Sequence, residues 1–541
     1  MIRQRFARTA ARPLVALATA LLVIVASVAM IPSSAGATAK AKKQQGKAKK
    51  RQQGKAKIKA KTKQPKKNRA KKKQQRSLGH AAPSADPLGD KCTGKDILGS
   101  GTSTQTIAQE AWYWFWRTHT SSTRTRGCGP WARQRVDYLE HDSRDGGLRL
   151  GPGAFGPGTP KRFETADNPP APAERALLEG NASVHAPARL ATVPAAQTAL
   201  VVAANFPKHC ELPAGDPDLA PYARFQVSNA RLATAWFGDA SHDQWGEFLP
   251  GIQAIPGNAS GRTDVSCKEQ AILRVVAPRR QQQTRLFMAF LQSAAPGLDW
   301  NSAFAALAWP NAHGVRQSGG RTAWDRAHSL YDTPGSITYL DLATARAESL
   351  QKKPTRRPTG AAYVYSSPTQ FAGYPAFGKR YSFHKSTFWI PLEAASAAAP
   401  SGSGQFFEPT IDRLSIRTGR MGANCRWSQY TGLPLHASGR INPLGDWTAA
   451  SALLQPGAYP ACALTYIAFW DDYADVYGDS RSERRKARTV KDFITTSFYS
   501  GQNILYSVDY APLPAPPPFD NPQNIRFASQ RAISLMSWKK P

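Results

Sequence analysis

"LATVPAAQTALVVAANFP", residues 190–207, places small and branched apolar residues in near-unbroken succession. Strands that are buried on both faces of a sheet have this composition, because neither face needs polar side chains. We interpret the run as buried strands broken by a loop. The 541-residue chain is 41% hydrophobic, which is enough apolar material for two cores.

Short apolar strands and amphipathic helices alternate on both sides of this run. "ILRVVAP" (272–278) predicts a buried strand, and "TPGSITYLDLATARAES" (333–349) predicts a turn, a strand and a helix. Helices are expected over 106–117, 172–179 and 284–294, over about 482–496, and in a segment that ends at Gly238. This alternation indicates an α/β fold.

The N-terminus has the order of an export signal. Arginines in the first twelve residues precede an apolar run over 14–31, and small residues follow at 35, 37 and 39. A signal peptide is therefore expected over 1–39, and the protein is expected to be secreted, extracytoplasmic or held at the cell surface. An uncleaved membrane anchor is the alternative, because about 18 apolar residues approach the length of a span.

The net charge of +34 is concentrated in one segment. Residues 40–76 hold 19 of the 71 Lys and Arg and no acidic residue, so a disordered linker is expected over 40–90. Outside the chain's first 76 residues the balance is only mildly basic. Acidic cell-wall polymers or anionic lipid headgroups are candidate partners of residues 40–76, and a solvated spacer without a partner is the alternative. No specific nucleic-acid recognition is expected, because nothing orders the segment for reading bases.

"GSGTSTQTIAQEAWYWFW" begins at Gly99 and sets hydroxyl-rich residues before a helix. A helix start leaves about four N–H groups without partners and attracts anions. The alternative is a helix capped without a ligand, because Thr102 with Gln105, and Thr106 with Gln109, fit capping boxes.

Motifs for catalysis or metal binding are missing from the sequence. There is no GxSxG, HExxH or P-loop, and no Cys pair has zinc spacing, so no enzyme activity, metal or cofactor is expected. "DSRDGG" resembles half of a calcium loop without its final Glu. Asp471, Asp472 and Asp475 are interpreted as an exposed loop rather than as a cation site.

In order, several segments resemble the phosphate-binding proteins of ABC-type phosphate importers, in the type 2 periplasmic-binding-protein superfamily. The landmarks are "GSGTSTQT", "VDYLEHDSRDGG", "ETADNPP", "VPAAQTALVVAANFP", "FQVSNARLATAWFGDASHDQW", "TPGSITYLDLATA", "YPACALTY" and "YAPLP", over about 90–345 and, more loosely, 425–515. The resemblance implies a two-lobed periplasmic-binding-protein-like fold with hinge-crossing strands and a ligand cleft between the lobes. It also implies phosphate or a similar oxyanion as ligand, and membrane importer subunits as partners.

The resemblance assigns site residues on the first lobe. The family's loop before the first helix binds oxyanion oxygens, and its positions fall on Ser103 and Thr104. A second family serine falls on Ser143, for which a simple turn residue is the alternative. The family's Asp, which accepts a hydrogen bond from protonated phosphate and thereby rejects sulfate, falls on Asp167. A cap ahead of Pro169 is the alternative there.

The second-lobe element departs from the family pattern. Where the family has Arg, then Asp, then Ser-Gly-Thr-Thr, this chain has Ala277, Arg279 and three glutamines at 281–283, with Thr284 retained. Loss of the glycine restricts close approach of the backbone to a ligand. We expect Arg279 or Arg280 to supply the charge, with Thr284 as a further ligand residue. The alternative is a solvated helix start in a protein that has lost its ligand.

These inferences give a division of the chain. We expect a signal peptide (1–39), a linker (40–90), a first lobe (91–205), a second lobe (206–335), a return to the first lobe (336–350), an insertion with low-complexity loops (351–424) and a C-terminal part of the first lobe (425–541). Six cysteines permit 15 disulfide connectivities. Pairing neighbours along the chain keeps each loop within one lobe, and we favour it.

The leading hypothesis is an extracytoplasmic solute-binding protein that captures phosphate or a related oxyanion for an importer. The alternative is a cell-surface protein with a degenerate binding fold that adheres to acidic polymers through residues 40–76.

Overall fold

The computed structural model describes much of the chain between residues 88 and 538. The described residues are 88, 90–119, 127–129, 133–140, 148, 150–151, 160–182, 188–213, 226–237, 243–277, 281–300, 309–310, 315–317, 322–348, 387–393, 406–409, 422–423, 425, 428–454 and 459–538. The predicted signal peptide and residues 40–76 lie outside them. Within them, no helix combines the length and the apolarity that a membrane crossing needs.

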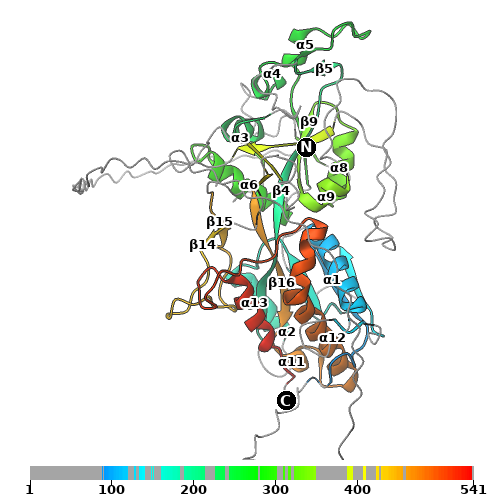
Figure 1. Ribbon diagram of the computed structural model, residues 1–541, viewed down its shortest axis with the longest axis vertical. Helices are drawn as coiled ribbons and strands as arrows, with labels where there is room; N and C mark the ends of the chain where they lie inside the picture. Colours follow the sequence, from blue (N-terminus) through cyan, green and yellow to red (C-terminus); the bar gives the residue numbers. More distant parts are fainter. Residues whose placement is uncertain are drawn as a thin grey trace, which may run out of the picture. The chain divides into compact units, whose positions relative to one another are not determined.

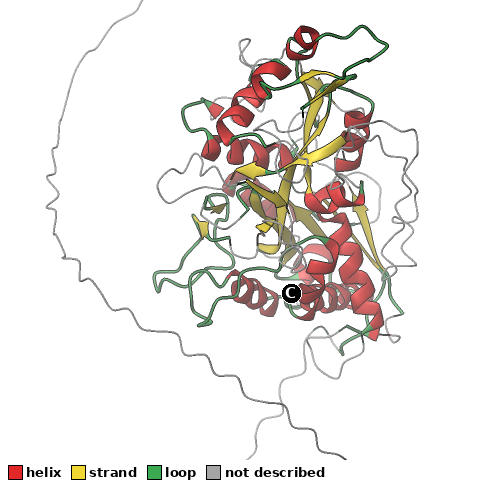
Figure 2. Cartoon of the chain, turned by 45° about the horizontal axis from the view of Figure 1, so that its top comes forward, coloured by secondary structure: helices red, strands yellow, loops and turns green. Residues whose placement is uncertain are grey.

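One mixed sheet of nine strands organises these residues, in the order β2-β1-β3-β16-β4-β9-β7-β8, with β10 also paired to β4. Helices flank its strands on both sides (Figure 2). Its strands are β1 (Ile97–Gly101), β2 (Val136–Glu140), β3 (Phe163–Ala166), β4 (Leu190–Asn205), β7 (Leu273–Val276), β8 (Val315–Gln317), β9 (Ser336–Asp341), β10 (Thr387–Ile390) and β16 (Cys462–Trp470). Short strands outside it are β5 (Cys210–Glu211), β6 (Gln253–Ala254), β11 (Leu392–Glu393), β12 (Phe406–Pro409), β13 (Gly422–Ala423), β14 (Tyr430–Thr431) and β15 (Ser451–Ala452).

Two hydrophobic cores share this sheet. The first core contains Trp112, Phe163 and Phe493, and the second contains Trp236 and Tyr339. Helices of the first core are α1 (Thr106–Thr118), α11 (Tyr473–Tyr477), α12 (Arg481–Phe498) and α13 (Ile525–Ser534), with the 3-10 helices η1 (Ser103–Gln105) and η6 (Ser500–Val508). Helices of the second core are α3 (Asn229–Phe237), α4 (Trp245–Phe248), α5 (Asp264–Lys268), α6 (Gln282–Ala294) and α8 (Ala323–Tyr331). The remaining helices are α2 (Pro172–Ala182) and α9 (Leu342–Ala347).

The strand β4 runs from one core to the other. Its first half pairs antiparallel with β16, and its second half pairs with β9 and β10. Side chains up to Ala196 belong to the first core, and those from Ala199 onward belong to the second. Figure 1 shows β4 and β16 side by side between the helices of the two cores. The predicted α/β fold is confirmed, with two cores joined by crossing strands.

The loop expected inside the 190–207 run is absent, and this prediction is wrong. All 16 residues of β4 form one buried strand. The register shifts between Thr465 and Tyr466 of β16, so Ala195 bulges beside Pro194, which has no N–H to donate. Gln502 Nε2 donates to Ala195 O at 2.9 Å, and Ser529 Oγ donates to Pro194 O at 2.8 Å. These bonds satisfy the bulge without interrupting the strand.

The predicted helices are present with shifted ends. The helix expected over 106–117 is α1, and the helix expected over 482–496 lies within α12. The helix expected over 172–179 is α2, which ends later, and the helix expected over 284–294 is α6, which begins earlier. The predicted insertion contributes β10, which adds a strand to the main sheet through pairing with β4.

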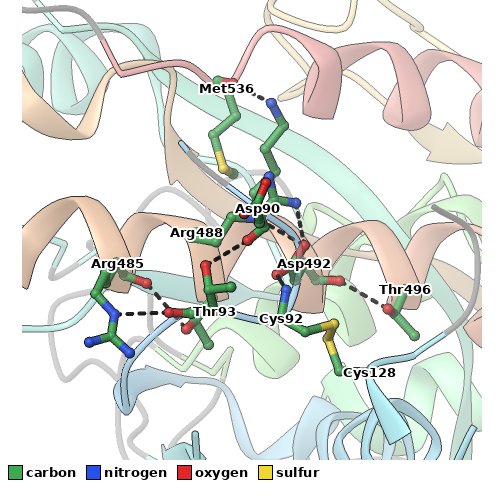
Figure 3. A network of polar contacts seen from close by, with 11 residues as sticks. Asp90, Cys92, Thr93, Cys128, Arg485, Arg488, Asp492, Thr496 and Met536 are labelled. Atoms are coloured by element: carbon green, nitrogen blue, oxygen red, sulfur yellow. Dashed lines mark hydrogen bonds and ion pairs between the residues drawn. A yellow bond between two sulfur atoms is a disulfide. The ribbon is translucent and has the colours of Figure 1, made fainter. Parts of the chain in front are cut away.

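Three disulfides join neighbouring cysteines along the chain, as predicted: Cys92–Cys128, Cys210–Cys267 and Cys425–Cys462. The first of them fastens the segment before β1 beside α12 (Figure 3). There, Cys92 N donates to Asp492 Oδ2 at 2.8 Å, and Arg488 Nε donates to Asp492 Oδ1 at 3.0 Å. Both side chains of this ion pair are buried.

The acidic group that follows β16 is not an exposed loop, so that prediction is wrong. Asp472 and Asp475 are buried, and Asp472 caps α11 by accepting from Ala474 N at 2.9 Å. Asp471 Oδ1 accepts from Arg189 N at 2.8 Å. The carboxylates of Asp471 and Asp472 thus serve as acceptors for backbone donors.

Candidate functional site

The loop between β1 and α1 is held close to β3. Gly101 has a φ of +144°, and a Cβ there would lie 2.2 Å from Thr165 O, so this position requires glycine. Thr102 N donates to Thr165 O at 3.3 Å. The Thr102 hydroxyl then caps η1 by accepting from Thr104 N at 3.2 Å. The geometry brings two hydroxyl side chains to the end of β3.

The predicted capping boxes are not formed. Gln105 Nε2 instead donates to Tyr466 O on β16 at 2.7 Å, and Gln109 Nε2 donates to Gln105 Oε1 at 3.1 Å. These side chains are buried, so they serve packing between elements rather than the helix end.

Two tyrosines from different parts of the sequence hold the loop by hydrogen bonds. Tyr138 OH, from β2, donates to Thr102 O at 2.9 Å, and Tyr510 OH donates to Thr104 O. The "VDYLE" and "YAPLP" segments therefore meet at the "GSGTSTQT" loop. Such restraint from several elements holds a ligand-binding loop rigid.

Asp167, directly after β3, is the centre of the site. Its Oδ2 accepts from Thr102 Oγ1 at 2.7 Å and from Thr104 Oγ1 at 2.9 Å. The side chain is 1% exposed, and its Oδ1 has no hydrogen-bond partner among the described residues. The loop thus orients a carboxyl group that keeps one oxygen available to a ligand.

Burial raises the pKa of Asp167 to about 7, although the hydrogen bonds from Thr102 and Thr104 oppose the rise. The buried carboxyl of Asp341 raises the same pKa further, and the charge of Arg326 lowers it. At neutral pH the group is therefore divided between its protonated and ionised forms. It can accept a hydrogen bond from a protonated ligand or donate one to an ionised oxygen.

The N-terminus of α6 lies against Asp167. Gln282 Oε1 accepts from Asp167 N at 2.5 Å and from Asn168 N at 3.3 Å, and Asn168 Nδ2 donates to Gln282 O at 2.9 Å. Since α6 belongs to the second core and Asp167 follows a strand of the first, these bonds span the two cores.

Further charged groups surround this contact. Asp341 caps α9 by accepting from Thr344 N at 2.9 Å, and burial raises its pKa. Burial also raises the pKa of Glu140, at the end of β2. Arg326, fully buried on α8, lowers the pKa of both carboxyls as well as that of Asp167.

A cavity of about 310 Å³ adjoins Asp167. It is lined by Asp167 and Asn168, by the α6 residues Arg285 and Met288, and by Tyr466 of β16. Its walls therefore come from both cores, beside the crossing strands.

The structure brings together only part of the predicted site. Thr104 and Asp167 are bonded to each other, whereas Ser103 is buried in η1 with no hydrogen bond from its hydroxyl to the described residues. The Thr284 hydroxyl pairs with Tyr339 OH, away from Asp167. Ser143, Arg279 and Arg280 lie outside the described residues. Their roles, like those of Ser103 and Thr284, stay predictions.

Sequence reasoning missed Thr102, Gln281, Gln282 and Arg326 as members of this cluster. Thr102 stands inside the quoted glycine-rich loop, so a search for every hydroxyl there would have included it. Nothing in the sequence marks Arg326, because its helix is an ordinary amphipathic segment that lies outside the quoted family motifs.

No family model matches the chain, and no curated protein is similar to it in sequence. Solved structures with some similarity include a high-affinity periplasmic phosphate-binding protein bound with phosphate, at 15% identity and a TM-score of 0.47, covering 81% of this chain and 93% of that one. A phosphate-binding protein from Stenotrophomonas maltophilia shows 14% identity and a TM-score of 0.46 over the same shares. A human phosphate binding apolipoprotein shows 16% identity and a TM-score of 0.46, over 81% of this chain and 94% of that one. All three TM-scores are below 0.5.

Proposed function

We propose that this chain is an extracytoplasmic solute-binding protein that binds phosphate or a related oxyanion beside Asp167 and presents it to an ABC-type importer. The observation that carries the proposal is the buried carboxyl of Asp167, held by two loop hydroxyls and left with one oxygen for a ligand. A protonated phosphate offers the hydroxyl donor that this oxygen requires. Sulfate has no such donor at neutral pH, so it can pair only with the protonated form of the carboxyl.

Placement between two cores supports a binding rather than a structural role. The site takes Thr102, Thr104 and Asp167 from one core and α6 from the other, so a ligand there would favour the closed arrangement of both. The three disulfides are typical of proteins from an oxidising compartment, in keeping with export. The importer partner rests on the sequence resemblance.

Titration calorimetry of the full chain with phosphate, arsenate and sulfate, at low ionic strength, tests the proposal. We expect phosphate and arsenate to bind, and sulfate to bind more weakly by a factor that increases as the pH rises above about 7 and Asp167 ionises. Thr104→Val removes one hydroxyl from Asp167 and should weaken phosphate binding about 2- to 10-fold. The matched control is Thr234→Val, whose exposed hydroxyl bonds only within α3 and which should bind like the parent.

Two results separate the hypotheses. Absence of binding heat for every oxyanion refutes the proposal. Binding confined to an acidic polymer such as polyglutamate, and lost in high salt, would favour adhesion through residues 40–76 instead.

A further inference from the structure

Arg326 is a buried cation with an unused donor. It lies on α8 with no exposed surface, and its guanidinium is 5.0 Å from the centre of the Tyr339 ring. Its Nε donates to Tyr339 O at 3.1 Å, and its Nη1 donates to Gln281 Oε1 at 2.7 Å. Its Nη2 is buried and has no partner among the described residues.

A buried guanidinium is stabilised by an opposite charge. Removing a guanidinium from water costs several kcal/mol unless an anion and hydrogen bonds compensate it. In the part of the chain that the structure describes, Arg326 forms no ion pair and bonds only to a carbonyl and an amide oxygen. The carboxyls of Asp167, Asp341 and Glu140 lie near enough for its charge to lower their pKa values, but none of them accepts a hydrogen bond from Nη2.

The N-terminus of α6 adds positive potential at the same place. This 13-residue helix begins after Gln281, which makes no side-chain capping bond, and it has no acidic residue in its first turn. The side-chain oxygen of Gln281 is used by Arg326 instead. A helix N-terminus carries roughly half a positive charge, so the guanidinium and the helix repel each other unless an anion lies between them.

We infer that Arg326 holds the bound anion from the side of the second core, at the N-terminus of α6, and supplies the charge that the sequence led us to expect from Arg279 or Arg280. The inference rests on the proposed function and adds a specificity-determining residue to it.

Asp167 supplies the second group that would contact the anion. Gln282, next to Gln281, accepts from Asp167 N, so Arg326 and Asp167 each contact the start of the same helix. Nη2 of Arg326 is an unpaired donor, and Oδ1 of Asp167 is an unpaired acceptor. A partly protonated oxyanion satisfies both, because it presents an ionised oxygen to the guanidinium and a hydroxyl to the carboxylate. A fully ionised dianion satisfies the second only where Asp167 is protonated.

Calorimetry of the full chain with inorganic phosphate tests the inference through four variants. Arg326→Gln should weaken binding about 10- to 150-fold, the range for a lost hydrogen bond to a charged group. Arg326→Lys keeps the charge without the second donor and should lose about 2- to 10-fold. Arg274→Lys is the matched control, because Arg274 is another buried arginine of the second core and donates to Trp236 O at 2.9 Å. The double variant Arg279→Gln with Arg280→Gln tests the residues expected from the sequence.

A second measurement separates contact with the anion from a structural role. Because the charge of Arg326 lowers the pKa of Asp167, Arg326→Gln should move the pH dependence of unfolding that Asp167 causes toward higher pH, without any ligand. Thermal unfolding and near-ultraviolet circular dichroism establish that each variant is folded. Should Arg326→Gln fail to fold, Arg326→Lys against Arg274→Lys carries the comparison.

The outcomes are distinguishable. If the parent chain binds phosphate and both Arg326 variants bind within twofold of it, Arg326 has no part in the site, although the proposed function stands. If only the Arg279 and Arg280 double variant loses affinity, Arg326 likewise has no part in the site. A parent chain that binds no phosphate overturns the proposed function and this inference together.

Discussion

Replacement of Asp167 by asparagine tests the electrostatics of the site without a ligand. The change keeps the shape of the side chain and an oxygen that can accept from Thr102 and Thr104, but it removes the titration. Burial raises the pKa of this carboxyl from 3.8 to about 7 in the folded protein. The unfolded chain therefore releases the proton at a lower pH than the folded chain does.

The direction of the pH dependence follows from the order of the folded and unfolded pKa values of Asp167. Because the folded pKa is the higher one, the stability that protonated Asp167 provides is complete below pH 3.8 and is lost as the pH rises through about 7. Each pH unit between these values costs about 1.4 kcal/mol of unfolding free energy. From pH 5 to pH 8 the parent chain should lose about 2–3 kcal/mol relative to Asp167→Asn.

Urea unfolding of both proteins in phosphate-free buffer at several pH values measures the difference. Comparison with the variant cancels the raised carboxyls that do not act on Asp167, those of Glu110, Glu140 and Glu174, whereas Asp341, which interacts with Asp167, contributes to the difference. A difference in unfolding free energy that stays constant from pH 5 to pH 8 would show that Asp167 is ionised throughout. The argument from burial would then be wrong.

Three further predictions concern other contacts. Gln282→Ala removes the acceptor for two backbone donors, so hydrogen exchange at the Asp167 and Asn168 amides should accelerate about tenfold. Unchanged exchange rates would contradict the contact between the cores. Asp492→Ala removes the carboxylate that forms a buried ion pair with Arg488 and should cost about 3–5 kcal/mol in urea unfolding. Asp520→Ala breaks the exposed ion pair with Arg440 and should cost less than about 1 kcal/mol; equal losses would refute the role of burial. Replacing Cys210 and Cys267 by serine opens a bridge between residues 57 apart and should cost about 4 kcal/mol, so an unaltered denaturation midpoint would count against it.

The family resemblance assigned Thr104 and Asp167 to the candidate site, and the structure bonds these two residues to each other. The glycine, the hydroxyls and the helix that follow β1 stand within a few residues of one another, and Asp167 directly follows a short strand. Turn chemistry and apolar patterning act over such distances. The same patterning gave α1, α6 and α12 with small errors at their ends.

The 190–207 run shows where local reasoning fails. Composition gave its burial correctly, but its continuity depends on Gln502 and Ser529, which satisfy the bulge from more than 300 residues away. The prediction that the acids after β16 are exposed fails for the same reason, because their burial depends on the backbone donors that surround them.

The sequence by itself therefore determined the alternation of strands and helices, the neighbouring disulfides and the loop that carries Thr104. Only the tertiary structure decided which polar groups are buried together: Asp167 meets Gln282 across 115 residues, and Arg326 meets Gln281 across 45. The physical reason is that periodicity records whether a residue faces a core, whereas the partner of a buried charge depends on how distant elements pack.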